Sequence, residues 1–522
     1  MSEYGDADQE TAWRSDISAG LARRRAKEIR FRLAGRSAVV FATLMLAALL
    51  ASLFVLASSA FVRHELTLET RLSTLQTADG SSPIADFTAS VRGDITDALP
   101  DIGDSLDAAR DLSLMVPRLA IVAEAERQAA VLKTRGRAAP VTIPISDDID
   151  LYLKGRSSAE FVRQANAFVL TPSLAGAATL RVPPSAVGLL DRVRAETEGG
   201  VLTSETPSLL FETDQGVWKG TTVSDNNLMI EPLLGRLVGA PDTRVVSGRL
   251  RLLWTPESER VFSDRQAAMA RWLQKDGLIR QGLNLRFFTG TDSTYPELAG
   301  ILAALVGSLL TMVVTASLAV PIGIMAAVYL EEFARDGRLT RFIELNINNL
   351  AAVPSIIFGL LGVAVLLNLA DLPRSAPLVG GLVLALLTLP TIIISARAAL
   401  RTVPMDHRNA ALAIGATRVQ VVADHVLPLA MPGILTGSII GLARALGETA
   451  PLLLIGMVAF VVEVPSGIRD EATTLPVLIF NWSKGAERAW EPLTAAAVVV
   501  LLALLLAINA FAVYLRNRLE QR

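Results

Sequence analysis

An arginine and a glutamate, Arg444 and Glu448, lie four residues apart in the otherwise apolar stretch 433–462. On a helix, this spacing places both side chains on one face, one turn apart. Each charge would cost about 2.5–3.5 kcal/mol at the centre of a bilayer, so both should face protein or a water-filled cavity. The planar guanidinium suits phosphate oxygens, and the carboxylate would hold it and partly neutralise it. The residues alone leave two roles open: lining the path of an anion, or locking helices of two subunits together.

A polar segment, residues 404–428, precedes that stretch. Its distinctive positions are Asn409, Ala410, Ala411, Gly415, Leu427 and Pro428. We expect a short amphipathic helix broken at Gly415, because glycine adopts positive φ at little cost. Such a helix can insert into a cleft on a partner protein. The alternative is an ordinary interhelical loop, because a Gly and a Leu-Pro pair are common in loops. Arg397, further upstream, is a weaker pathway candidate, since an arginine at the end of a membrane span also serves as a snorkelling anchor.

The composition excludes several classes of function. The 522 residues include no Cys and only three His, which removes disulfides, thiolate zinc sites and a His-rich metal site. No Gly-Lys dipeptide occurs, so the phosphate-binding loop of P-loop ATPases is absent. The net charge of −2 provides no bulk basic field for nucleic acid. We therefore expect no catalytic site, no cofactor, no metal and no nucleic-acid partner.

Long uncharged apolar runs set the organisation of the chain, which is 51% hydrophobic. About 20 apolar residues cross a bilayer as a helix. The sequence predicts six such spans, at about 37–62, 298–330, 345–370, 375–397, 432–462 and 492–515. Residues 1–36 form a basic tail, and residues 63–296 have the mixed composition of a globular domain that can bury its own core. The expected fold class is an all-α polytopic membrane protein with an inserted α+β domain.

The placement of basic residues predicts how the chain is oriented. Basic residues cluster before the first span, in the loop after the fourth span and at the C-terminus; those in the loop are Arg397, Arg401, Arg408 and Arg418. Short loops that face the cytoplasm carry the excess of Arg and Lys. Both termini and the 404–428 segment are therefore predicted to be cytoplasmic, and residues 63–296 extracytoplasmic.

Local patterns within residues 63–296 predict individual elements. Helices are expected at 105–133 and at 264–276, the second capped by Ser263, and strands at 141–145, 245–254 and 283–288. Asp147, Asp148 and Asp150 suggest calcium, but no Asp-x-Asp-x-Asp-Gly loop with a distant Glu follows them. A solvated acidic turn is therefore the preferred interpretation.

The 404–428 segment resembles the EAA loop of ABC-transporter permeases in its small residues, its glycine and its final Leu-Pro. Two positions depart from that pattern: Asn409 stands where Glu is usual, and His425 where Ile is usual. Residues 443–451, 353–360 and 389–397 look like signatures of phosphate-specific ABC permeases, and residues 475–482 and 509–510 are similar to the PstA-type subunit. The resemblance covers residues 298–522 and the first span. Residues 63–296 look like the long extracytoplasmic insertion carried by a subset of PstA-like proteins.

The resemblance implies a type I ABC importer permease fold over residues 297–522, with a cytoplasmic coupling loop at 401–430. It implies a non-enzymatic subunit of a phosphate importer in the cell inner membrane, with ATP hydrolysed by another chain. The implied partners are a homologous PstC-type permease, two ATP-binding subunits, an extracytoplasmic phosphate-binding protein, phosphate and membrane lipid. Arg444, Glu448 and Arg397 would line the pathway. A permease for another oxyanion, and a membrane receptor that uses residues 63–296, are the alternatives.

Overall fold

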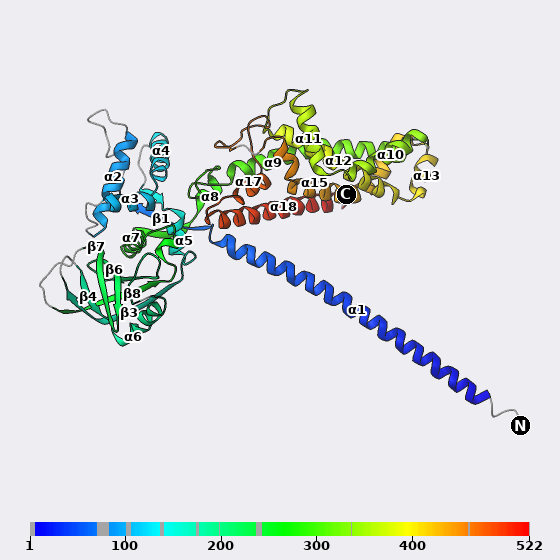
Figure 1. Ribbon diagram of the computed structural model, residues 1–522. Coiled ribbons are helices and arrows are strands. Elements are labelled where there is room, and N and C mark those ends of the chain that lie inside the picture. Colours follow the sequence, from blue (N-terminus) through cyan, green and yellow to red (C-terminus); the bar gives the residue numbers. More distant parts are fainter. Residues whose placement is uncertain are drawn as a thin grey trace.

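The computed structural model describes most of the chain as a globular domain and a helical bundle, with one long helix leaving the junction between them (Figure 1). The described residues are 6–69, 83–100, 106–135, 140–173, 177–197, 199–235, 243–335, 337–457 and 460–520.

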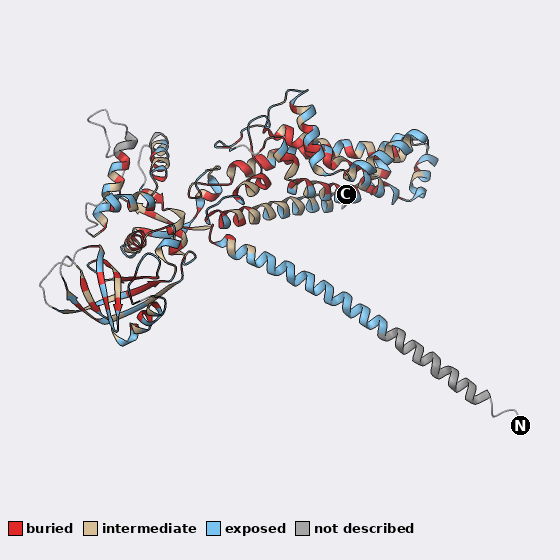
Figure 2. Cartoon of the chain, viewed as in Figure 1, coloured by how far each residue is buried: buried red, intermediate tan, exposed pale blue. Residues whose placement is uncertain are grey.

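The long helix is α1 (Asp6–Ser58). The predicted tail, residues 1–36, is therefore helical from Asp6 onward, because it contains no proline and is rich in the strong helix formers Ala, Arg, Glu and Lys. Residues Lys27–Ser58 are long and apolar enough to cross a membrane, and no part of their most apolar window is buried against the rest of the protein. Figure 2 shows this exposure along the described side chains. The helix ends at Ser58, before the predicted end of the span at residue 62.

The globular domain begins with a three-stranded antiparallel sheet. Its middle strand is β1 (Val62–Leu68), which pairs with β2 (Val141–Pro144) on one side and β9 (Ile279–Leu283) on the other. A buried apolar cluster joins this sheet to surrounding helices. The helices of this part are α2 (Pro83–Ala98), α3 (Leu106–Met115), α4 (Arg118–Arg135), α5 (Asp147–Leu153), η3 (Glu257–Glu259) and α7 (Asp264–Lys275).

Six further strands close into an antiparallel barrel in the order β3-β4-β7-β6-β5-β8. Closure leaves the sheet without a free edge. Phe168 and Phe211 fill the interior with ring centroids 4.9 Å apart, and Gly248 is needed beside them, since a Cβ there would lie 2.6 Å from the Phe211 ring. The barrel is therefore a packed core. Its elements are β3 (Glu160–Pro172), β4 (Ala178–Arg181), α6 (Pro184–Ala195), β5 (Ser208–Glu212), β6 (Val217–Ser224), β7 (Asn227–Leu234) and β8 (Arg244–Leu253).

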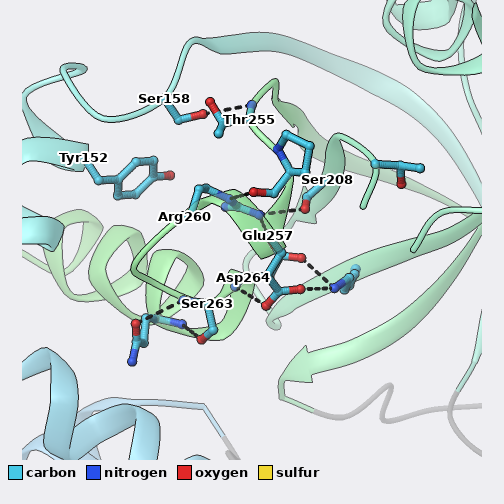
Figure 3. A network of polar contacts seen from close by, with 12 residues as sticks. Tyr152, Ser158, Ser208, Thr255, Glu257, Arg260, Ser263 and Asp264 are labelled. Atoms are coloured by element: carbon cyan, nitrogen blue, oxygen red, sulfur yellow. Dashed lines mark hydrogen bonds and ion pairs between the residues drawn. The ribbon is translucent and has the colours of Figure 1, made fainter. Parts of the chain in front are cut away.

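A buried polar network fixes the barrel to α7 (Figure 3). Arg260 donates to Ser208 Oγ at 2.8 Å and to Asp264 Oδ1 at 2.6 Å, and the side chains of Arg260 and Asp264 are each 1% exposed. Lys219, on the barrel strand β6, forms ion pairs with Asp264 at 2.7 Å and with Glu257 at 2.6 Å. These bonds join residues of the barrel to the first turn of α7.

The local predictions for this domain are partly right. The predicted strands at 141–145 and 245–254 are present as β2 and β8, and Ser263 caps α7 in a capping box with Gln266. Pro117 separates α3 from α4 where one helix was expected. The predicted strand at 283–288 is wrong, because Asn284 accepts the Phe287 N–H and begins the helix α8 (Leu285–Thr289).

In the part of the chain that the structure describes, the bundle contains four long apolar helices. They are α9 (Leu302–Val328) with its extension η4 (Tyr329–Phe333), α12 (Pro377–Arg401), α15 (Leu427–Gly447) and α18 (Trp490–Glu520). Glycines bring α9 and α12 close together, since a Cβ at Gly381 would lie 2.5 Å from Val314, and one at Gly323 would lie 2.6 Å from Ile392. Small residues allow this close approach of helices in lipid. The predicted spans at 298–330, 375–397 and 492–515 correspond to α9, α12 and α18.

The predicted span at 345–370 is not one straight helix. It consists of α10 (Arg338–Ala351), α11 (Ser355–Leu361) and η5 (Gly362–Leu367), with a bend of 104° at the break. Pro354 explains the break, because its ring disfavours helical geometry at the preceding residue. The described chain thus has five helices long and apolar enough to span a membrane, or up to six if this bent pair counts as one span.

The predicted span at 432–462 also needs correction. Its helix, α15, begins earlier, at Leu427, and ends at Gly447. Glycine is a poor helix former, and Glu448 after it is extended (φ −80°, ψ 111°). Two short helices follow, α16 (Ala450–Leu454) and α17 (Leu475–Trp482).

The globular domain lies beyond one end of the bundle, and the 404–428 segment lies at the opposite end (Figure 1). That segment contains α13 (Met405–Ala413), α14 (Arg418–Gln420) and η6 (Val421–Val426).

Candidate functional site

Arg444 lies on the outer face of α15. Apart from Pro428, the exposed positions of this helix recur at helical spacing and form a stripe: Leu429, Gly433, Thr436, Ile440, Arg444 and Gly447. The opposite face, which includes Gly437, Gly441 and Ala445, is buried against the bundle. The Arg444 side chain is 55% exposed. Its guanidinium therefore points away from the core of this subunit.

Glu448 meets Arg444 from the end of the helix. It is the first residue after α15, so the expectation that both charges lie within one helix is wrong. The contact itself is present, with 3.5 Å between Arg444 Nε and Glu448 Oε1. Glu448 is the less exposed partner, with 22% of its side chain accessible. The extended backbone after Gly447 thus still leaves the carboxylate beside the guanidinium.

The cavity inside the bundle near this pair is too small for an oxyanion. It measures about 10 Å³ and is lined by Ser308, Thr311, Ala445 and Thr474, among others. A single water needs at least about 10–15 Å³. Arg444 does not line this cavity and lies on the outer face of α15. An arginine on such a face is costly against lipid, so a second protein or water has to cover it. Both roles inferred for Arg444 and Glu448 remain predictions.

The 404–428 segment has the expected break but not the expected end. Gly415 has φ +92°, and Thr417 caps the next turn. From α14 the chain continues through η6 into α15 as one long helix. Leu427 and Pro428 therefore do not close a loop but lie in the first turn of α15. Pro428 has no N–H to donate to the preceding turn, and that turn, η6, is π-helical.

Several side chains of this segment are available to a partner. Asn409 and Ala410 are exposed, whereas Ala411 is buried. Four apolar side chains are also exposed: Met405 at 64%, Leu412 at 46%, Ile414 at 81% and Val419 at 63%. Exposed apolar side chains gathered in a short polar segment favour contact with another protein.

Arg397 does not point into an open path in this structure. Its guanidinium lies 3.2 Å from Glu331 Oε2 and 2.5 Å from Glu344 Oε1. Arg401 also pairs with Glu331, at 2.8 Å. A pathway role for Arg397 stays a prediction, but two carboxylates already occupy its donors.

Sequence reasoning missed the acids in this region and the role of Arg408. Arg408 pairs with Glu332 at 2.7 Å, and their side chains are 13% and 11% exposed. The available signal was the dipeptide Glu331-Glu332 at the end of an apolar run, together with arginines in the later loop. From the sequence, Arg401 and Arg408 are interpreted only as signs of orientation, and Arg397 also as a pathway candidate.

Two acidic residues at the start of α5, the buried Asp150 and the largely buried Asp147, lie at the junction between α1 and the globular domain. Asp150 accepts the His64 backbone N–H at 2.9 Å, lies 2.9 Å from His64 Nδ1 and pairs with Lys154. Asp147 pairs with Arg63 at 2.8 Å. The interpretation as a solvated acidic turn is therefore wrong for these two residues. Within the described residues, no group of three or more His, Asp or Glu side chains could hold a metal ion.

Burial shifts the pKa of these junction residues. It raises the pKa of Asp147 to about 7, and the Arg63 charge only partly opposes it. Burial would also raise the pKa of Asp150, but the His64 hydrogen bond and the Lys154 charge outweigh it and hold that pKa below its usual range. Burial lowers the pKa of Lys154. Asp147 is thus a group that changes charge near neutral pH at this junction.

Comparison with known proteins gives two matching regions. Residues 319–521 match the family described as binding-protein-dependent transport system inner membrane component. Residues 18–162 match a domain of unknown function, DUF3333, so most of the barrel lies outside both regions. The inward-facing MetNI methionine ABC transporter is 20% identical with a TM-score of 0.35, covering 42% of this chain and 96% of that one.

Individual relatives point to one class of permease. The phosphate transport system permease protein PstA 1 of Mycobacterium tuberculosis (strain CDC 1551 / Oshkosh) is 34% identical over 217 residues, which are 42% of this chain and 70% of that protein. PstA of Mycobacterium leprae (strain TN) is 36% identical over 213 residues, or 41% of this chain and 69% of that protein.

The chain therefore belongs to the binding-protein-dependent transport system inner membrane components, which are the membrane-spanning permease subunits of ABC importers. Within that family it is a permease of the PstA type. It is a membrane component without enzymatic activity of its own, and the ATPase is a separate chain. The inserted domain that contains the β-barrel lies between α1 and the helices of the permease core.

Proposed function

We propose that this chain is a permease subunit of an ATP-driven importer that carries inorganic phosphate across the cytoplasmic membrane. The observation that carries the proposal is its 34–36% identity to two PstA permeases of phosphate transport systems. An arginine on the outward stripe of α15 supports it, since a guanidinium fork suits phosphate oxygens.

The proposed complex contains a PstC-type permease, two ATP-binding subunits and an extracytoplasmic phosphate-binding protein. The path would run between the two permeases, along the outer face of α15, with Arg444 contacting the anion and Glu448 keeping its binding transient. Asn409, Ala410, Ala411 and Gly415 would belong to the surface that meets an ATPase. Closure of the ATPases would move this segment and open the path outward and then inward.

The proposed topology has six spans with both termini in the cytoplasm, the bent pair α10–α11 crossing as one span. The opposite positions of the globular domain and α13 support it, together with the arginines around α13 (Figure 1). Because the chain has no cysteine, single cysteines report sidedness without background. A membrane-impermeant maleimide should label Leu106→Cys in intact cells but not Leu412→Cys, and the reverse result would overturn the orientation.

Uptake of radiolabelled phosphate in cells with and without the chain tests the function. Uptake should require the chain and should persist in excess unlabelled sulfate. Loss of uptake in the presence of sulfate would indicate a permease for a broader class of oxyanions. Unchanged uptake without the chain, in cells lacking other phosphate importers, would overturn the proposal and favour a receptor role for the globular domain.

A further inference from the structure

Six charged side chains meet at the end of the bundle that carries α13. They are Glu331, Glu332, Glu344, Arg397, Arg401 and Arg408. The acids come from η4 and α10, and the arginines come from α12 and α13. The cluster therefore connects four elements at the end where a partner ATPase would bind.

Arg408 ties α13 into this cluster. Its Nη2 and Nε donate to the two carboxylate oxygens of Glu332 at 2.7 and 3.3 Å. Its guanidinium also donates to the carbonyl oxygens of Leu400 and Val403, at the C-terminal end of α12. Leu400 lies in the last turn of α12 and Val403 two residues beyond its end, where carbonyls have no α-helical N–H partner. One guanidinium thus joins α13 to the ends of both α9 and α12.

Glu331 makes the second connection. It accepts hydrogen bonds from Arg397 and Arg401 of α12, and Arg397 also binds Glu344 of α10. Neighbouring residues of a helix point in different directions, so the single turn η4 presents one carboxylate to α13 and the other to α12. Single π-helical turns such as η4 occur frequently at functional sites.

Burial makes part of this cluster a strong constraint on geometry. The side chains of Arg408, Glu332 and Arg397 are only 11–14% exposed. Removal of one partner from a buried pair leaves an uncompensated charge, which is strongly unfavourable. Arg401 is 61% exposed, and an exposed ion pair contributes little. Arg401 therefore provides a control within the cluster, because it binds one of the acids, Glu331, from the solvent side.

The loop also lacks the acid that its family resemblance leads one to expect. Position 409 is an exposed asparagine, and the charged residue beside it, Arg408, faces the bundle and binds an acid there. The charged connection of this loop is thus directed toward its own subunit.

We propose that Arg408 and Glu332 are positioning residues that transmit movement of α13 to α9. The proposal rests on the proposed function, because it takes displacement of α13 by a partner ATPase as its input. The buried pair moves the end of α9 together with α13. The contacts of Arg397 with Glu331 and Glu344 connect α12 and α10 to the same turn. We therefore expect α9, α10, α12 and α13 to move together.

Coupling efficiency tests this proposal in the full complex reconstituted in lipid vesicles, with inorganic phosphate uptake and ATP hydrolysis measured together. In Arg408→Gln and in Glu332→Gln, ATP hydrolysis should persist while phosphate uptake per ATP falls roughly tenfold, the scale expected for coupled residues of one ion-pair network. Arg408→Lys keeps the charge and should recover part of the loss. Arg401→Gln is the control and should behave as wild type. Unchanged uptake per ATP in both Gln variants overturns the proposal.

A distance measurement decides the matter even if those variants fail to assemble. Leu412 on α13 and Phe333 at the end of η4 are exposed, and the chain has no cysteine, so Leu412→Cys and Phe333→Cys allow specific spin labelling. The distance between the labels should stay the same with and without ATP when Arg408 and Glu332 are present. If the distance changes with ATP, then α13 and the end of α9 do not move together. That result overturns the proposal, whether or not phosphate is transported. A constant distance, combined with absence of phosphate uptake by the parent complex without the cysteine substitutions, refutes the proposed function alone.

Discussion

Replacing Arg444 with alanine should separate folding from transport. Arg444 forms one ion-pair contact with its own chain, 3.5 Å from Glu448, and its side chain is 55% exposed. An exposed pair contributes at most about 1 kcal/mol to stability. Substitutions at exposed positions usually change the free energy of unfolding by less than about 0.5 kcal/mol. Arg444→Ala should therefore fold and enter the membrane like the parent chain.

The effect on transport should be much larger. A hydrogen bond to a charged group contributes about 1.5–3 kcal/mol. Loss of one such bond to a passing anion corresponds to roughly a 10- to 150-fold weaker interaction with the anion, at about 1.4 kcal/mol per factor of ten. Phosphate uptake by Arg444→Ala should fall by one to two orders of magnitude. Arg444→Lys keeps the charge without the planar fork, so its uptake should be intermediate.

Radiolabelled phosphate uptake measures the loss, and copurification of the partner permease and ATPases measures assembly. Ile440, one turn earlier on the same stripe and 62% exposed, provides the control, and Ile440→Ala should retain uptake. If Arg444→Ala no longer copurifies with the partner permease while Ile440→Ala does, the arginine locks subunits and the pathway role is refuted. Wild-type uptake by an assembled Arg444→Ala complex would refute both roles.

Three other predictions concern packing and the globular domain. Gly381→Ala should lower the melting temperature of the purified chain, because the new Cβ would lie 2.5 Å from Val314 of α9 and overpacking costs about 1–3 kcal/mol. Gly441→Ala is the control: its new Cβ would have its nearest contact at 3.4 Å, so the melting temperature should stay the same. Asp264→Ala should cost roughly 3–5 kcal/mol in denaturant unfolding, since it leaves Arg260 buried without its carboxylate, and a cost under about 1 kcal/mol would contradict the network. Asp147→Asn should become more stable relative to wild type as pH rises from about 5 to about 8, because a raised pKa gives wild type stability that is lost as the carboxyl ionises near pH 7. A pH-independent difference in melting temperature would contradict this last prediction.

The apolar core of the bundle could be predicted from the sequence because length and hydropathy are local properties. The uncharged runs that became α9, α12 and α18 needed no knowledge of their neighbours. The left-handed conformation of Gly415 and the capping box at Ser263 followed from local chemistry as well. The predictions were wrong where a single residue interrupts an apolar run that was expected to form one helix. Pro354 divides the second apolar stretch of the core, and Gly447 ends α15 before Glu448.

The polar clusters could not be predicted, because each depends on which elements pack together. Arg408 and Glu332 are 76 residues apart, and an unpaired arginine in the same loop would give the same sequence pattern. Asp150 looked solvated because its partner His64 lies 86 residues away on another element. The barrel could not be predicted either, because its closure depends on the pairing of β3 with β8, two strands that lie far apart in the sequence.

The chain enters the globular domain through β1 and leaves it through β9, and these two strands pair with each other. Val62 lies opposite Leu283 in this pair, and the Asn284 N–H donates to the Phe61 carbonyl at 2.9 Å. The chain thus departs after α1 and returns before α8 through adjacent, hydrogen-bonded positions. Two such antiparallel strand ends can be joined by a two-residue turn. A chain without this domain could therefore join α1 to α8 at the same place, with no change in the spacing or order of the helices that form the permease core.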